Sequence, residues 1–121
     1  MYTTWITRRI RVMDLTTIMA NQRKLQEEYY PKFMAELSNE QRLQDNLKHI
    51  MHETVEVERE TNFKHWKQPV QVDWDKVREE LVDVFIFFMN ACNEANLSAH
   101  DLMLLTSRKQ EINRERQRTG Y

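Results

Sequence analysis

The sequence predicts an all-α protein, a bundle of four to five helices that is completed by dimerisation. Turn residues are scarce, because the chain of 121 residues has one glycine, Gly120, and two prolines, Pro31 and Pro69. Sheets and hairpins need such residues every few positions, whereas long helices need none. Charged residues make up 31% of the chain, which is typical of solvated helix faces. The length fits one all-α domain over residues 1–121, with residues 1–13 as a loosely ordered N-terminal arm.

The first helix is expected to begin after Asp14, a candidate N-cap, and to run to about Tyr29. Pro31 ends or kinks it, because the residue before a proline avoids helical angles. A short turn of helix over residues 33–37 is expected to follow.

A long second helix is expected over residues 40–64, where Ser38 and Asn39 can supply the N-cap. Apolar residues recur along one side of it at helical spacing, and we expect this side to be buried. The stripe consists of Leu43, Leu47, Ile50, Met51, Thr54 and Val55.

The third helix is expected to start after Asp73, to run to about Ala95, and to be apolar almost all round. A helix of this kind is buried on most sides, which in so small a protein indicates a dimer interface as well as a core. Ser98 can cap a fourth helix that runs to about Arg118, with Asp101 in the capping-box position.

Composition excludes several classes of protein. The formal net charge of −1 creates no field toward nucleic acid or an anionic membrane, so neither is an expected partner. No apolar run approaches the roughly 18 residues that span a bilayer, and residues 1–13 lack the apolar stretch of a signal peptide. The single cysteine, Cys92, excludes an intramolecular disulfide and fits a reducing compartment. We expect a cytoplasmic protein, located in the host cytoplasm if a virus encodes it.

Two pairs of carboxylates are the main chemical signal. Glu80 and Asp83 lie three residues apart inside the most apolar stretch of the third helix, where an unpartnered charge is costly. Glu53 and Glu56 have the same spacing on the second helix and can face them if the two helices pack antiparallel. Four converging carboxylates favour a hard divalent cation such as Mg²⁺ or Mn²⁺. Such cations usually serve phosphate chemistry, where they bridge phosphate oxygens and activate water.

A plainer interpretation of these carboxylates stays open. Glu-x-x-Glu is common on solvated helix faces, and a lone pair of this kind is usually not functional. The charge of Glu80 and Asp83 could also be balanced by Lys48 or Arg78, which are close in sequence, instead of by a metal.

The C-terminal helix carries a basic face formed by Lys109, Asn113 and Arg116. Positive side chains near a carboxylate–metal site would complement a polyphosphate. Lysine and arginine near a helix C-terminus also favour the helix dipole, and most such clusters do nothing more.

Four short motifs follow one another along the chain. "ETVE" occupies residues 53–56, "ETNFKHWK" residues 60–67, "ELVD" residues 80–83, and "KQEINRERQRTGY" residues 109–121. In this order they resemble the dimeric all-α dUTPases of the MazG-like nucleotide pyrophosphatase superfamily. The first and third match its Glu-x-x-Glu and Glu-x-x-Asp pattern. The second resembles the Phe-Lys-x-Trp signature of dUTPases, and the fourth their closing Lys-x-x-x-Asn-x-x-Arg-Gln-x-x-Gly-Tyr. The resemblance covers residues 15–121.

The resemblance implies a homodimer, bound Mg²⁺ that Mn²⁺ can replace, and hydrolysis of dUTP to dUMP and pyrophosphate by a metal-activated water. It assigns metal binding and catalysis to Glu53, Glu56, Glu80 and Asp83. It assigns phosphate binding to Lys64, Lys109, Asn113, Arg116 and Tyr121. It assigns base and sugar binding to Gln22, Gln26, Trp66, Phe87 and Asn90. The chain departs from the family near Gln26, where Asp or Asn is usual, and at Ile86, which replaces a frequent histidine.

Two other functions compete with dUTP hydrolysis. A MazG-like pyrophosphatase could use the same chemistry on dCTP, a purine dNTP or a damaged nucleotide, and the residues of the base pocket would distinguish it. A non-catalytic helical dimer that binds a partner would show no metal dependence, and it would tolerate loss of Glu56 or Asp83.

Overall fold

The computed structural model describes residues 14–120, and all regular structure within that range is helical. The helices are α2 (Leu15–Tyr29), α3 (Pro31–Glu36), α4 (Asn39–Arg59), α5 (Trp74–Glu94) and α6 (Ala99–Thr119). The predicted all-α class is therefore confirmed. The expected N-terminal arm, residues 1–13, lies outside the described residues, as does Tyr121.

Each predicted N-cap begins its helix. Asp14 accepts a backbone N–H of the first turn of α2 at 2.8 Å, and this bond lowers the pKa of its carboxyl. Ser38 and Gln41 form a complete capping box at the start of α4. The side chains of Asp73 and Ser98 accept backbone N–H groups at the starts of α5 and α6. These local bonds explain why the helix starts could be predicted from sequence.

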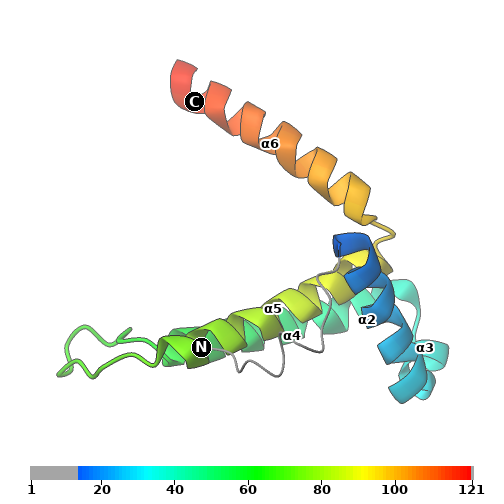
Figure 1. Cartoon of the computed structure of the whole chain (residues 1–121), viewed down its shortest axis with the longest axis horizontal. Helices are drawn as coiled ribbons and strands as arrows, with labels where there is room; N and C mark the ends of the chain where they lie inside the picture. Colours follow the sequence, from blue (N-terminus) through cyan, green and yellow to red (C-terminus); the bar gives the residue numbers. More distant parts are fainter. Residues whose placement is uncertain (1–13, 121) are drawn as a thin grey trace.

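Helix α4 ends at Arg59, short of the predicted end at Lys64. The reason is the side chain of Asn62, which accepts the backbone N–H of Val70 at 2.9 Å and donates to the Val70 carbonyl at 2.8 Å. Such side-chain bonds compete with helical hydrogen bonding. They close residues 60–73 into a loop between α4 and α5, drawn at the far left of Figure 1.

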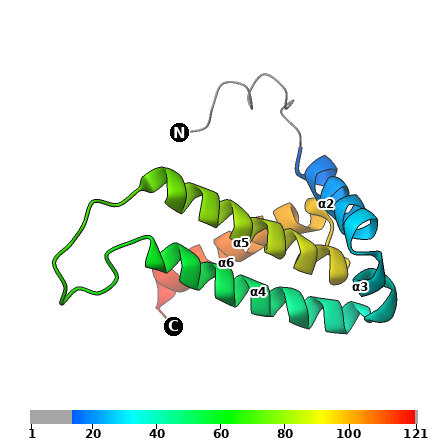
Figure 2. The ribbon, with the colours of Figure 1, turned by 90° about the horizontal axis from the view of Figure 1, so that it is seen from below.

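Helices α4 and α5 lie side by side and antiparallel, and α2 and α3 lie at the end opposite the loop (Figures 1 and 2). A small apolar core joins α2, the C-terminal half of α5 and the start of α6. It contains Met19, Met89, Cys92 and Ala99, with Leu15, Ile86, Leu97 and Leu102 packed against them. Burial raises the pKa of the Cys92 thiol.

Helix α6 joins this core only through its first turns. Asn96, with a φ of 56°, reverses the chain after α5. Ala99 is buried and Leu102 half-buried, whereas residues 103–119 are exposed. Figure 1 shows the rest of α6 diverging from the α4/α5 pair.

The apolar stripe predicted to be buried on α4 is largely exposed in the single chain. Leu47, Met51 and Val55 are exposed by 44% or more, while Arg42 and Asn46 are buried on the side that meets α5. The prediction was wrong because it assigned the apolar side of α4 to the core, whereas polar side chains form the seam with α5. No helix in the described range is long and apolar enough to cross a membrane.

Candidate active site

The seam between α4 and α5 has a constant antiparallel register. The residues of α4 that face α5 follow one another at spacings of four, three and four positions. The residues that they meet on α5 have the same spacings in the opposite chain direction. Such spacings keep side chains on one face of each helix. Four pairs of residues occupy matching positions along this seam: Arg42 with Glu94, Asn46 with Asn90, His49 with Phe87, and Glu53 with Asp83. The seam therefore runs from a buried ion pair, through amides and aromatic rings, to carboxylates.

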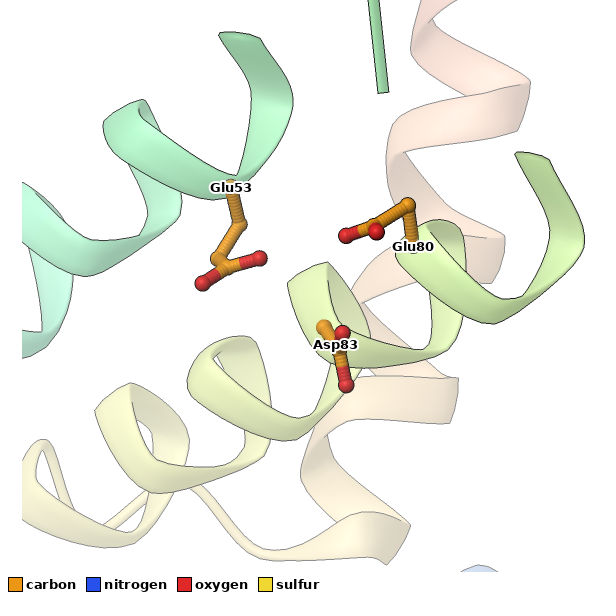
Figure 3. A group of neighbouring side chains, drawn as sticks. All are labelled: Glu53, Glu80 and Asp83. Atoms are coloured by element: carbon orange, nitrogen blue, oxygen red, sulfur yellow. The ribbon is translucent and has the colours of Figure 1, made fainter. Parts of the chain in front are cut away.

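Glu53, Glu80 and Asp83 form a carboxylate cluster at the end of this seam that lies nearer the loop. One oxygen of each lies within 4.8 Å of the others. Figure 3 shows Glu53 reaching from α4 toward Glu80 and Asp83 on α5. Glu53 and Glu80 are half-buried and Asp83 is exposed, so the cluster is open to solvent on the Asp83 side.

The cluster holds an excess of negative charge. The pKa of Glu53 is raised, first because burial desolvates its carboxylate, and then because Asp83, Glu80 and Glu56 repel it. Lys76 Nζ lies 3.3 Å from Glu80 Oε1, and this contact raises the pKa of Lys76. One exposed ammonium group cannot neutralise all the carboxylates. Oxygen ligands with unbalanced charge fit a hard divalent cation.

The ion-pair partner of Glu80 is thus Lys76. Neither Lys48 nor Arg78, the two partners proposed from sequence, takes this role among the described residues. Arg78 instead pairs with Asp75 at 3.1 Å. Glu56 lies beside the close group of three rather than in it. Its half-exposed carboxylate is 3.6 Å from Arg59 Nη1, although its charge is felt at Glu53.

A pocket of about 480 Å³ lies between α2, α4 and α5, one helical turn from the carboxylate cluster. Four of the predicted base- and sugar-binding residues line it: Gln22, Gln26, Phe87 and Asn90. Gln26 and Asn90 are buried, and Gln26 Oε1 and Asn90 Oδ1 have no hydrogen-bond partner among the described residues. Buried polar atoms are nearly always paired in folded proteins. These two atoms are therefore available to accept hydrogen bonds from a polar ligand in the pocket.

Sequence reasoning missed the contribution of α4 to this pocket, which consists of Asp45, Asn46 and His49. The ring of His49 stacks on that of Phe87, with 4.7 Å between the centroids and 12° between the planes. Helical periodicity could have revealed His49 and Asn46, since they lie one and two turns before Glu53 on the same face.

The other predicted site residues are not gathered at the pocket in the single chain. Trp66 is 78% exposed on the loop of residues 60–73, where the Lys64 Nζ atom lies 5.7 Å from the centre of the Phe63 ring. Three predicted phosphate-binding residues are exposed on the diverging part of α6: Lys109, Asn113 and Arg116. The fourth on this segment, Tyr121, lies outside the described residues.

The chain was compared with known protein families, curated proteins and solved structures. A family model described as dUTPase matches residues 14–115, a segment that contains both the carboxylate cluster and the pocket. None of the curated proteins and none of the solved structures matches the chain.

Proposed function

This chain belongs to the all-α dUTPase family, and on that premise we propose that it hydrolyses dUTP to dUMP and pyrophosphate. Family membership places it among dUTPase-like hydrolases of nucleoside triphosphates. The observation that carries the proposal is the adjacency of two sites on one helix seam. A carboxylate cluster for metal and phosphate lies one helical turn from a pocket that can hold a base. A nucleotide needs both, because its base and its phosphates lie on opposite sides of the sugar.

Glu53, Glu80 and Asp83 would hold Mg²⁺, or Mn²⁺ in its place, with Glu56 at the edge of the group. When bound, such a cation would supply positive charge that offsets the carboxylates and the phosphates and lowers the pKa of water. The raised pKa of Glu53 supports this assignment, since a bound cation would offset both of its causes, the burial of the carboxylate and then the repulsion by its acidic neighbours. We assign proton acceptance from the attacking water to Glu56, because its carboxylate stays outside the close group.

The pocket would hold the base and the sugar. A side-chain amide offers both a donor and an acceptor, so Gln22, Gln26 and Asn90 can complement the uracil edge, where an N–H lies between two carbonyls. The ring of Phe87 offers a stacking surface. One feature favours a second substrate. The carboxylate of Asp45 also lines the pocket and could accept a hydrogen bond from the amino group of cytosine, which makes dCTP the alternative.

We also propose that the enzyme is a homodimer. Large apolar side chains are exposed by 40% or more on several helices of the single chain, among them Leu47, Met51 and Val55 on α4, Leu81, Val82, Phe85 and Phe88 on α5, and Met103, Leu104, Leu105 and Ile112 on α6. Soluble monomers rarely expose contiguous apolar surface on this scale. A second copy would cover these faces, and it would give the exposed phosphate-binding residues of α6 a carboxylate cluster to approach.

Pyrophosphate release from a panel of nucleoside triphosphates, with Mg²⁺ and with EDTA, tests the proposal. We expect Mg²⁺-dependent turnover of dUTP well above the others, and none for Asp83→Asn despite normal folding. Preferred turnover of dCTP or a purine dNTP would keep the carboxylate chemistry and reassign the base pocket. No turnover of any triphosphate would overturn the enzymatic assignment.

A further inference from the structure

The stack of His49 on Phe87 is a contact that the proposed function does not use. The two rings belong to neighbouring helices, α4 and α5, and both line the pocket. They are nearly parallel, with planes 12° apart and centroids 4.7 Å apart. Face-to-face contact of this kind holds both rings in one orientation.

This stack restricts how a base can meet Phe87. An aromatic ring inserted between His49 and Phe87 would need about 7 Å between them, which is two carbon–carbon contact distances. Because the centroids are 4.7 Å apart, no base fits there. A base that stacks on Phe87 must therefore use the opposite face of its ring, with His49 behind it.

We propose that His49 is a positioning residue that acts through Phe87 and keeps the opposite face of that ring turned toward the base. This inference rests on the proposed function. Phe87 is only half-buried, so its surroundings do not hold it on every side, and removal of His49 would leave room for the ring to rotate. His49 is itself restrained, because its Nε2 atom lies 3.4 Å from Asp45 Oδ2, one turn earlier on α4.

The test compares His49→Ala, which removes the stack, with His49→Phe, which keeps a ring in the same place. His49→Ala should raise KM for dUTP, and the Kd for dUMP, about three- to tenfold, the range expected for one aromatic stack. The decrease in kcat should be smaller. His49→Phe should restore both constants to near the wild-type values, which a general need for an imidazole would not allow. Thermal unfolding of both variants checks that the fold is intact.

A double-mutant cycle makes the test specific for Phe87. If His49 acts through that ring, His49→Ala should add almost nothing in a Phe87→Ala background. The inference would be overturned if His49→Ala had its full effect in the Phe87→Ala background. It would also be overturned if His49→Ala alone left the dUMP affinity unchanged. Different results contradict the proposed activity and the proposed role of His49. A wild-type protein that cleaves no triphosphate contradicts the proposed activity, whereas dUMP affinity, measured by calorimetry, reports on the stack without any turnover.

Discussion

Arg42 and Glu94 join α4 to α5 through a buried hydrogen bond, with 2.6 Å between Arg42 Nε and Glu94 Oε2. The side chain of Glu94 is fully buried and that of Arg42 is 7% exposed. Arg42 Nη1 also donates to the backbone carbonyls of Met34 and Leu37, and Arg23 Nη1 lies 3.1 Å from the same oxygen of Glu94. This network holds α2, α3, α4 and α5 together at the end of the seam that lies farther from the carboxylate cluster.

Loss of one partner of this ion pair should destabilise the whole fold. Glu94→Ala leaves the Arg42 guanidinium buried without its counter-charge, and it should lower the free energy of unfolding by about 3–5 kcal/mol. Urea denaturation followed by circular dichroism measures the change. Glu36→Ala is the matched control, because it breaks an ion pair with Lys32 that is well exposed to solvent, and it should have little effect. Equal losses in the two variants would show that the buried pair is not important for stability.

Glu53→Gln should stabilise the protein at neutral pH in the presence of EDTA. Because the fold raises the pKa of Glu53, the folded state binds this proton more tightly than the unfolded chain does. The resulting stability is fully present below the ordinary value of 4.5 and is lost as pH rises through the raised pKa. At pH 7 the wild type therefore retains a half-buried charge, with its desolvation cost and its repulsion, that the variant lacks, whereas the two should be alike below pH 4.5.

The same pair of proteins tests metal binding without an activity assay. Mg²⁺ should raise the Tm of the wild type, since a ligand that binds only the folded state stabilises it. The Tm of Glu53→Gln should respond much less. A wild-type Tm that is indifferent to Mg²⁺ and to Mn²⁺ would contradict the metal site.

Asn90→Leu should separate stability from substrate binding. The Oδ1 atom of Asn90 is buried without a hydrogen-bond partner among the described residues, so an apolar side chain of the same branched shape should leave stability unchanged or higher. The substrate loses a polar contact, and kcat/KM for dUTP should fall about tenfold or more. Gln44→Leu, at an exposed position on α4, is the control and should leave kcat/KM unchanged. Full activity in Asn90→Leu would remove Asn90 from the site.

Arg116→Ala should raise KM and lower kcat for dUTP. Negative charge on the transferred phosphate grows in the transition state, so a cation that binds it contributes to both constants. Arg108→Ala is the control, because it removes a basic residue from an exposed position on the same helix but outside the closing motif. Steady-state kinetics of the two variants decide the matter. An unchanged kcat/KM in Arg116→Ala would exclude a phosphate-binding role.

Phe85→Asp should dissociate the homodimer. Phe85 is 42% exposed on α5 in the single chain, within the apolar surface that we assign to the interface. A charge placed there would be buried without a partner in the dimer. Light scattering coupled to gel filtration should show a dimer for the wild type and for Thr16→Asp, an exposed position on α2, and a monomer for Phe85→Asp. A monomeric wild type would contradict the dimer.

Sequence alone determined the helical class, the starts of the four long helices and the carboxylate pairs. These features depend on interactions over three or four residues, which a pattern can report. Ser38 and Ser98 each accept an N–H from the residue three positions later. The spacing of Glu80 and Asp83 likewise puts both carboxylates on one face of α5 before any packing is known. Only the antiparallel pairing with α4 was needed to bring Glu53 to them.

The tertiary structure decided which residues lie opposite each face of a helix. His49 meets Phe87, Arg42 meets Glu94, and α4 ends early because Asn62 bonds to Val70 across the loop. Local patterns define the faces of a helix but not its neighbour, because the neighbour depends on packing between side chains that are distant in sequence. For that reason the polar seam replaced the apolar stripe expected at the centre of the bundle. Because of the same dependence on packing, α6 diverges from the carboxylates in the single chain. Its basic residues were expected to lie near them and to bind phosphate.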